Sequence, residues 1–279
     1  PKISDWLDEK FIKENNLIEW NDAIKKLHTS DESKKSNSKS FRRIVFDEIC
    51  ANFITLSKSR TRVKKIKKKI KFFNETTSES IVKTLPFDLT NAQLRCLNEI
   101  NLDLKSKDRM FRIIQGDVGS GKTIVAILSI VNVIESRYQC ALMGPTEILA
   151  FQHYKLAQKL FYQTDIKIEF LSGKMDSKKK KVILEKLKEG KIDLIIGTHA
   201  LFQKNIEFKN LGYVVIDEQH KFGVKQRSEF AKKGGNNCDV LLMSATPIPR
   251  TMMMSLYGDM DLSKITEKPA IRKKIITIS

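Results

Sequence analysis

The chain has 279 residues, enough for one large or two modest domains with a sizeable buried core. Its net charge of +18 favours polyanionic partners such as nucleic acid, although a general lysine bias would give the same charge. Four scattered cysteines without a C-x-x-C pair argue against a zinc site and fit reduced thiols in the cytoplasm, and no apolar run is long enough to span a membrane. The start, PKISDWLDEK, is no signal peptide and lacks an initiator Met, so we expect a piece of a longer protein.

The first third of the chain is expected to be helical. Residues 1 to about 30 have helical apolar spacing, and the polar segment Thr29 to Ser40 predicts an exposed loop. From Phe41 to Phe73 apolar residues recur mostly at three- and four-residue steps, which predicts one long helix. Its second half, Lys58 to Lys71, carries nine Lys or Arg and no acid. This basic face would contact DNA or a neighbouring domain, or would simply be solvated.

A linker is expected near residue 84. The polar stretch Asn74 to Ser80 and the tripeptide Leu85-Pro86-Phe87 divide the chain into a helical segment, 1–84, and a main domain, 85–279. Thr90 then fits a helix N-cap, with Gln93 as the reciprocal member of a capping box. Capping alone would explain Gln93.

A glycine-rich loop follows a short apolar strand in FRIIQGDVGSGKT. The loop fits G-x-x-x-x-G-K-[ST], and its expected phosphate-binding residues are Gly116, Gly119, Ser120, Gly121, Lys122 and Thr123. Its glycines let successive N–H groups converge on phosphate oxygens, and the next helix adds the positive end of its dipole. Lys122 is expected to reach the β- and γ-phosphates of ATP, and the Thr123 hydroxyl to bind Mg²⁺. The strand before the loop and the apolar helix after it argue against a chance glycine turn.

Beyond this loop, apolar runs alternate with helical patterns. The expected strands are Gln139 to Met143, Ile166 to Leu171, Ile192 to Ile196, Tyr213 to Ile216 and Asp239 to Met243. The expected helices are Glu147 to Tyr162, Ser177 to Glu189, about Val224 to Lys232, and a short one after Pro249. Alternation of this kind predicts an α/β fold: a mostly parallel sheet with helices on both faces and ligands at the carboxyl ends of its strands.

Two acids follow the strand that ends at Ile216. Asp217 is expected to hold Mg²⁺, directly or through water, and Glu218 to orient the attacking water and accept its proton. We expect these acids and the phosphate loop at neighbouring strand ends, which favours catalysis over a helix cap. His220 has no metal-ligand spacing around it and is expected to be an ordinary packed histidine.

Other strand ends carry hydroxyls and small residues. Ser244 and Thr246 would bond to the loop of the paired acids and sense the nucleotide state, or would cap the next turn. Residues 144–147, 171–173 and 197–201 combine small or hydroxyl side chains with backbone N–H groups at helix starts, which suits phosphate contacts without base recognition. Each segment alone is an ordinary loop, and their recurrence on successive strands indicates a polymeric ligand.

These segments resemble those of superfamily two helicase motors and, more narrowly, the RecG family of branched-DNA helicases. The resemblance rests on LPFDLTNAQ, GDVGSGKT, ALMGPTEILAFQH, IIGTHAL, VVIDEQHKFGVKQR and SATPIPRTMMMSLYGDMDLS, which cover residues 85–279 almost continuously. Transcription-repair coupling translocases share GDVG-x-GKT and TPIPRT, but typically carry a DEEQ-type box and PTT where this chain has DEQH and PTE. Upstream, WNDAIKKLH and FRRIVFDEI are similar, more loosely, to the family's segment between wedge domain and motor.

The resemblance implies a RecA-like first motor lobe that uses ATP and Mg²⁺ to act on replication forks and Holliday junctions in recombination and repair. It also implies that Gln93 reads adenine, and that Ser244 and Thr246 couple hydrolysis to DNA movement. The residues implied to lie along the DNA groove are Thr146, Glu147, Gly197, Thr198 and His199.

Two parts of the family pattern are missing from this sequence. No run of five strands precedes residue 84 as the wedge domain requires, and the chain stops at Ser279, after the first lobe. The second lobe supplies an arginine finger, worth about a thousandfold or more in rate. We therefore expect a monomer that binds nucleotide weakly and hydrolyses it very slowly. The alternative is a non-catalytic DNA- and nucleotide-binding remnant of a split helicase.

Overall fold

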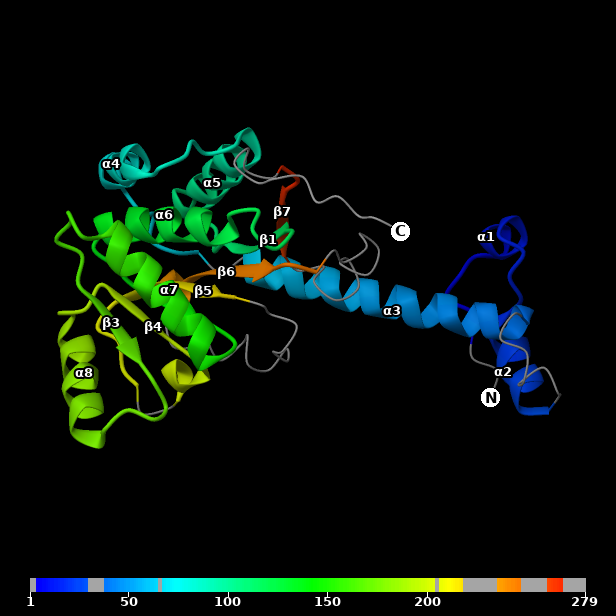
Figure 1. The fold of residues 1–279 in the computed structure, drawn as a ribbon. Helices are drawn as coiled ribbons and strands as arrows, with labels where there is room; N and C mark the ends of the chain where they lie inside the picture. Colours follow the sequence, from blue (N-terminus) through cyan, green and yellow to red (C-terminus); the bar gives the residue numbers. More distant parts are fainter. Residues whose placement is uncertain are drawn as a thin grey trace, which may run out of the picture. The chain divides into compact units, whose positions relative to one another are not determined.

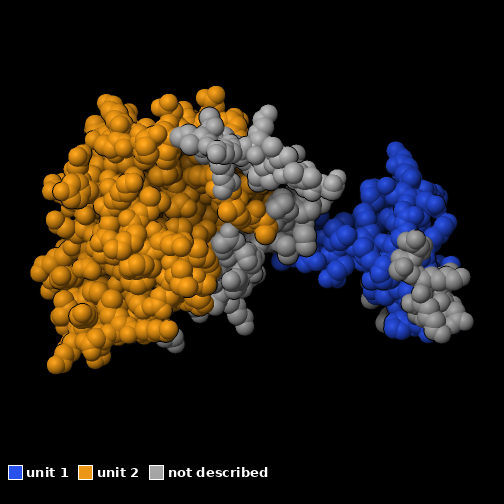
Figure 2. All heavy atoms as spheres, viewed as in Figure 1, with its two compact units in different colours: residues 1–61, 249–259 blue, residues 62–248, 260–279 orange. Residues whose placement is uncertain are grey.

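The structure is a computed structural model that describes residues 4–29, 38–64, 67–203, 206–217, 235–246 and 260–267. Its two compact units comprise residues 1–61 with 249–259, and residues 62–248 with 260–279 (Figure 2). The described part of the first unit is helical, and the second unit contains the sheet. The compact units divide after Thr61. This division by contacts does not test the domain boundary expected near residue 84, which stays a prediction.

The first unit contains α1 (Glu9–Glu14), α2 (Trp20–Thr29) and most of α3 (Lys39–Lys64). Its centre is a buried guanidinium: the Arg43 side chain is 0% exposed, lies 2.6 Å from Asp5 Oδ1 and 3.0 Å from Asp47 Oδ2, and donates to the Ile18 carbonyl. Its hydrogen bond lowers the pKa of Asp5 to about 2. A buried charge cluster therefore joins α3 to the segments that precede α1 and α2.

The prediction of one helix through Phe73 is wrong in its last part. The helix α3 ends at Lys64, and Lys67 pairs with Asp108 in an isolated antiparallel bridge. Lys68 and Lys71 do not belong to a basic helix face, because both side chains are fully buried with their ammonium groups 2.6 Å from Asp239 Oδ2. This contact, between residues far apart in the sequence, outweighs the local helical periodicity.

In its described residues the second unit contains a seven-stranded sheet with the order β3-β4-β2-β5-β6-β1-β7 (Figure 1). Every pair of neighbouring strands is parallel, which confirms the predicted α/β class. The strands are β1 (Phe111–Gly116), β2 (Gln139–Met143), β3 (Ile168–Leu171), β4 (Leu194–Gly197), β5 (Leu211–Ile216), β6 (Asp239–Ser244) and β7 (Asp261–Ile265). The sequence interpretation missed β7.

The order of the strands corrects one expectation. The phosphate loop follows β1 and Asp217 follows β5, but these strands are not neighbours, because β6 lies between them. Ser244 ends this intervening strand, so its position next to β5 agrees with the sequence prediction. The site is therefore spread over three strand ends.

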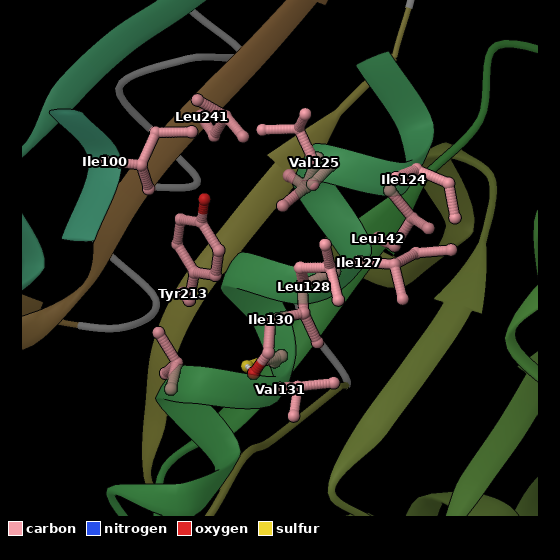
Figure 3. Packing of buried hydrophobic residues seen from close by; sticks show 14 of the residues in the cluster. Ile100, Ile124, Val125, Ile127, Leu128, Ile130, Val131, Leu142, Tyr213 and Leu241 are labelled. Atoms are coloured by element: carbon pink, nitrogen blue, oxygen red, sulfur yellow. Dashed lines mark hydrogen bonds between the residues drawn. The ribbon is translucent and has the colours of Figure 1, made fainter. Parts of the chain in front are cut away.

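Helices cover the sheet and place its carboxyl-end loops. They are α4 (Thr76–Thr84), α5 (Asn91–Leu104), α6 (Lys122–Glu135), α7 (Glu147–Leu160) and α8 (Ser177–Glu189), with 3₁₀ turns at His199–Phe202 and Gly235–Asn237. All residues of β2, β4, β5 and β6 are buried, as expected for strands covered on both faces. The apolar helix α6 packs among Leu142, Tyr213 and Leu241 of the sheet (Figure 3).

Several predicted features lie outside the described residues. They are the helices expected at 224–232 and after Pro249, together with Glu218 and His220. None of the described helices combines the length and the apolar character that crossing a lipid bilayer requires.

Candidate nucleotide-binding site

The phosphate loop joins β1 to α6 and has the strand–loop–helix setting that its pattern predicts. Gly119 and Gly121 have φ angles of 78° and 85°, in the left-handed region that favours glycine. A Cβ at Gly121 would lie 2.2 Å from Gln93 Nε2, so a larger residue would also displace that amide. The curl of the loop therefore depends on glycine at this position.

Lys122 begins α6 and folds back over its own loop. Its ammonium group donates to the carbonyl oxygens of Gly116 and Asp117, at 2.6 and 2.9 Å. The neighbouring Ser120 hydroxyl is buried and has no hydrogen-bond partner among the described residues. A buried hydroxyl without a partner is costly, and a phosphate oxygen would satisfy it. These residues therefore fit the phosphates of a nucleotide.

Gln93 connects the start of α5 to the phosphate loop. The predicted capping box is present: Thr90 accepts from the Gln93 N–H, and Gln93 Oε1 accepts from the Thr90 N–H at 2.9 Å. The other end of the same amide donates to the Ser120 carbonyl at 2.8 Å. Gln93 thus does more than cap a helix, since it also holds the loop that would receive phosphate.

A residue that the sequence interpretation missed lies beside Gln93. Glu267, just beyond β7, accepts a hydrogen bond from the Ala92 N–H at 3.1 Å and lines a pocket of about 250 Å³ with Gly116 and Ser120. Its carboxylate lies at the start of α5, where the helix dipole favours negative charge. No local pattern marks Glu267, because its role depends on the pairing of β7 with β1.

Asp217 stands at the end of β5. Its backbone N–H donates to the Met143 carbonyl at 2.9 Å, and its Oδ2 lies 2.8 Å from His153 Nε2. Both side chains are largely buried, with exposures of 13% for Asp217 and 10% for His153. The sequence interpretation missed His153, although it shares the buried face of α7 with Ala150 and Ala157. The sequence signal that could have identified His153 is a histidine at a core position of this helix.

Thr123 and Asp217 are the described candidates for Mg²⁺ binding. Thr123 is half-buried in the first turn of α6. In the described ranges, His, Cys, Asp and Glu side chains do not gather in groups of three or more that could hold a metal ion. A hydroxyl and one carboxylate still suit Mg²⁺, which is often bound by few protein groups together with substrate phosphates.

Ser244 is the last residue of β6 and Thr246 lies just beyond it, between the two halves of the site. Ser244 is buried, and its hydroxyl lies 3.0 Å from the Thr246 hydroxyl. The Gln115 amide donates to the Thr246 carbonyl at 3.0 Å, which links this segment to the end of β1. The two hydroxyls thus bond to each other, and the Thr246 carbonyl connects their segment to the strand that precedes the phosphate loop.

Thr146 and Glu147 stand at the start of α7, at the carboxyl edge of the sheet. Thr146 is exposed and is the N-cap, accepting from the Leu149 N–H at 3.3 Å. The Glu147 carboxylate accepts a hydrogen bond from the Ser172 hydroxyl, on the loop after β3. A carboxylate repels phosphate, so this geometry suits Glu147 to hold a loop and not to contact DNA.

Gly197, Thr198 and His199 form the corresponding end of β4. The Gly197 carbonyl accepts from the Gly144 N–H at 2.9 Å, so the ends of β4 and β2 lie side by side. Thr198 is half-buried and His199 is exposed. The structure therefore brings all five expected groove residues to one edge.

A larger pocket, of about 760 Å³, lies at the opposite edge of the sheet. Residues at or just before the amino ends of β2, β4 and β5 line it, including Gln139, Asp193 and Asn210. In parallel α/β sheets ligands bind at the carboxyl ends of the strands, so pocket size alone does not locate the site.

Comparison with known proteins gives consistent matches. The DEAD/DEAH box helicase family matches residues 90–255. The chain is 42% identical to the ATP-dependent DNA helicase RecG of Aquifex aeolicus (strain VF5), covering 98% of this chain and 35% of the relative. It is 43% identical to RecG of Bacillus subtilis (strain 168), covering 99% of this chain and 40% of the relative.

The fold also matches a solved structure, described as RecG bound to a three-way DNA junction. The TM-score is 0.80 at 38% identity, covering 98% of this chain and 37% of that one. This match confirms the predicted RecA-like α/β fold. The chain spans 35–40% of the length of the two curated relatives.

Proposed function

The chain belongs to the DEAD/DEAH box helicase family, and we propose that it is the ATP-binding first motor lobe of a RecG-type helicase that acts on branched DNA. The observation that carries the proposal is the phosphate loop, whose Lys122 ammonium rests on two loop carbonyls beside the unpartnered Ser120 hydroxyl. Both groups would gain better partners in a triphosphate, because ammonium–phosphate hydrogen bonds are charge-assisted.

The proposed reaction is hydrolysis of ATP by an activated water. Lys122 would leave its carbonyls for the β- and γ-phosphates, and Thr123 and Asp217 would hold Mg²⁺, which neutralises developing charge on the phosphates. Glu218 would orient the water and accept its proton. Gln93 would read the adenine from its place against the loop. Asp217 is well suited to hold Mg²⁺, since the hydrogen bond from its backbone N–H to the end of β2 fixes its position.

The proposed DNA groove follows the carboxyl edge of the sheet. Thr146, Gly197, Thr198 and His199 would contact backbone phosphates, which gives binding without base recognition. Glu147 would act indirectly, by holding the loop that contains Ser172. Ser244 and Thr246 would relay the nucleotide state to DNA. Branched DNA is proposed because a similar RecG structure is described with a three-way junction.

Slow turnover by this polypeptide is part of the proposal. The RecG relatives are longer, and we assign the wedge domain and the second lobe with its arginine finger to their additional length. Within a whole motor, the lobe would act as a monomer in the cytoplasm, on recombination and repair intermediates.

A steady-state ATP hydrolysis assay with and without three-way junction DNA tests this function. We expect Mg²⁺-dependent nucleotide binding, salt-sensitive DNA binding and very slow turnover. Lys122→Ala should abolish the residual hydrolysis and spare DNA binding. Robust DNA-stimulated turnover would contradict the need for a second lobe, and unchanged turnover in the variant would contradict the site. DNA binding without any nucleotide binding would favour the non-catalytic remnant.

A further inference from the structure

The helix α7 connects the proposed DNA groove to Asp217, at the carboxyl end of β5. Its first residues lie in the groove, where Thr146 caps the helix and Glu147 is bonded to Ser172. Two turns further along, His153 faces the interior and bonds to Asp217. One continuous helix thus carries both a groove contact and a contact to a proposed Mg²⁺ ligand.

The packing of α7 makes it a rigid connection. It packs on β3 and β4 (Figure 1). At Gly144 an added Cβ would lie 2.7 Å from the Ala150 nitrogen and 2.9 Å from its Cα, so the helix backbone approaches the end of β2 closely. Side chains in such tight packing adopt discrete arrangements and transmit displacements. A shift at the helix start would therefore be felt at His153.

Asp217 receives hydrogen bonds from two directions. Its backbone N–H is bonded to Met143 at the end of β2, which fixes the position of its Cα. This backbone bond does not fix the side-chain torsions of Asp217. Its Oδ2 lies 2.8 Å from His153 Nε2. When it is ionised, the Asp217 carboxylate can only accept, and the Nε2–H tautomer of His153 then donates to it. The orientation of this carboxylate thus depends on a residue of α7.

We propose that His153 is a positioning residue that couples DNA contact at the start of α7 to the orientation of the Asp217 carboxylate. The inference rests on the proposed function and adds to it a physical connection between the DNA site and the nucleotide site. DNA that fixes the helix start would fix the imidazole, and the imidazole would present Asp217 for Mg²⁺-nucleotide. Coupling of this kind is reciprocal, so nucleotide would change DNA affinity by the same factor.

The test is an equilibrium titration of the 279-residue chain with a non-hydrolysable fluorescent ATP analogue and Mg²⁺. Nucleotide affinity is measured without DNA and with saturating three-way junction DNA, and the ratio of the two affinities reports the coupling. For the natural chain we expect a ratio of about fivefold or more, the usual lower range for coupled sites. In His153→Ala the ratio should fall to about one, because the link to Asp217 is lost.

Two further variants separate coupling from folding. In His153→Gln the amide nitrogen stands as many bonds from Cβ as the imidazole Nε2 does, so this variant should recover part of the ratio. Gln152→Ala changes the neighbouring exposed residue of α7 and should leave the ratio unchanged. If circular dichroism shows that His153→Ala is unfolded, the glutamine variant decides: a recovered ratio supports the proposal, and a ratio of one in this folded variant overturns it.

The outcomes distinguish this inference from the proposed function. A natural-chain ratio of one, or a natural ratio preserved in folded His153→Ala, overturns the coupling role while leaving nucleotide and DNA binding in place. A natural chain that binds neither ligand overturns the proposed function, and the inference with it.

Discussion

Two lysine-rich segments of the second unit, residues 67–71 and 178–181, have similar compositions, but only the first contains fully buried lysines. In the first, the side chains of Lys68 and Lys71 are 0% exposed and share the carboxylate of Asp239. In the second, Lys178, Lys179 and Lys181 are exposed on the first turns of α8. Composition gives both segments the same basic character, and the position of an acid elsewhere in the fold separates them.

Lys68, Lys71 and Asp239 form a buried charge cluster with further hydrogen bonds. Lys68 also donates to the Asp103 carbonyl at 2.9 Å, and Lys71 to the Asn237 carbonyl at 3.0 Å. Asp239 Oδ1 accepts from the Met110 N–H at 2.7 Å. Burial lowers the pKa of Lys68, and the charge of Asp239 acts in the opposite direction. These lysines anchor the segment after α3 to the start of β6, which excludes them from DNA contact.

Within the described part of the chain, the exposed lysines of the second segment form no comparable buried ion pair. The first turn of α8 contains no acid, and its N-cap Asp176 accepts from the N–H groups of Lys178 and Lys179. Cations at a helix start oppose the helix dipole, so this arrangement does not serve helix stability. The turn stands at the carboxyl edge of the sheet, beyond β3. We therefore expect the α8 lysines to contact DNA phosphates if the proposed groove is correct.

Removing the shared acid should have the largest effect on the buried segment. Asp239→Ala would leave two buried ammonium groups without their counter-charge, which costs about 3–5 kcal/mol of unfolding free energy. Urea denaturation followed by circular dichroism measures this loss. The matched control, Asp165→Ala, removes an exposed acid and should change stability by less than about 0.5 kcal/mol. Equal effects of the two variants would refute the charge cluster.

Removing one ammonium group should lower the free energy of unfolding by less than removing Asp239. Lys71→Met keeps an unbranched side chain, one heavy atom shorter and without the ammonium group, and leaves the Lys68–Asp239 pair intact. The loss of hydrogen bonds from one charged donor predicts a decrease of about 1.5–3 kcal/mol in the free energy of unfolding. The same denaturation assay measures it. A loss as large as that of Asp239→Ala would mean that Lys68 cannot satisfy the carboxylate alone.

Charge reversal on α8 should weaken DNA binding and spare stability. The triple variant Lys178→Glu, Lys179→Glu, Lys181→Glu is expected to lose roughly tenfold in duplex affinity at low salt, with a shallower salt dependence. Fluorescence anisotropy at several salt concentrations measures both quantities. The exposed residues of the other segment provide the control, and Lys67→Glu with Lys69→Glu should reduce affinity by less than about twofold. The reverse ranking would show that the first segment faces DNA.

This comparison also shows where sequence reasoning succeeds and where it stops. The parallel sheet and the phosphate loop were predictable because their signals are local: an apolar strand, glycines, and an apolar helix in sequence. The burial of Lys71 was not, since its partner lies 168 residues away. The strand β7 was missed because Asp261, Ser263 and Lys264 interrupt its apolar pattern, and among the described strands its neighbour is β1.

The candidate site likewise contains residues that local motifs identify and residues that only the fold brings together. The loop residues from Gly116 to Thr123 and the strand-end acid Asp217 follow from motifs with a mechanism. His153 lies 64 residues from Asp217 in the sequence, and only the fold brings them together. The insertion of β6 between β1 and β5 likewise cannot be read from the order of elements along the chain. Motifs therefore name the chemistry, and topology supplies the residues that position it.

Equilibrium binding of a fluorescent ATP analogue tests the central claim most directly. The natural chain should bind the analogue in the presence of Mg²⁺. Lys122→Ala should weaken binding at least tenfold, because a charge-assisted contact worth about 1.5–3 kcal/mol is lost. Asp217→Asn should remove most of the dependence on Mg²⁺. Unchanged affinity in Lys122→Ala, together with unchanged Mg²⁺ dependence in Asp217→Asn, would contradict the assignment of the nucleotide site.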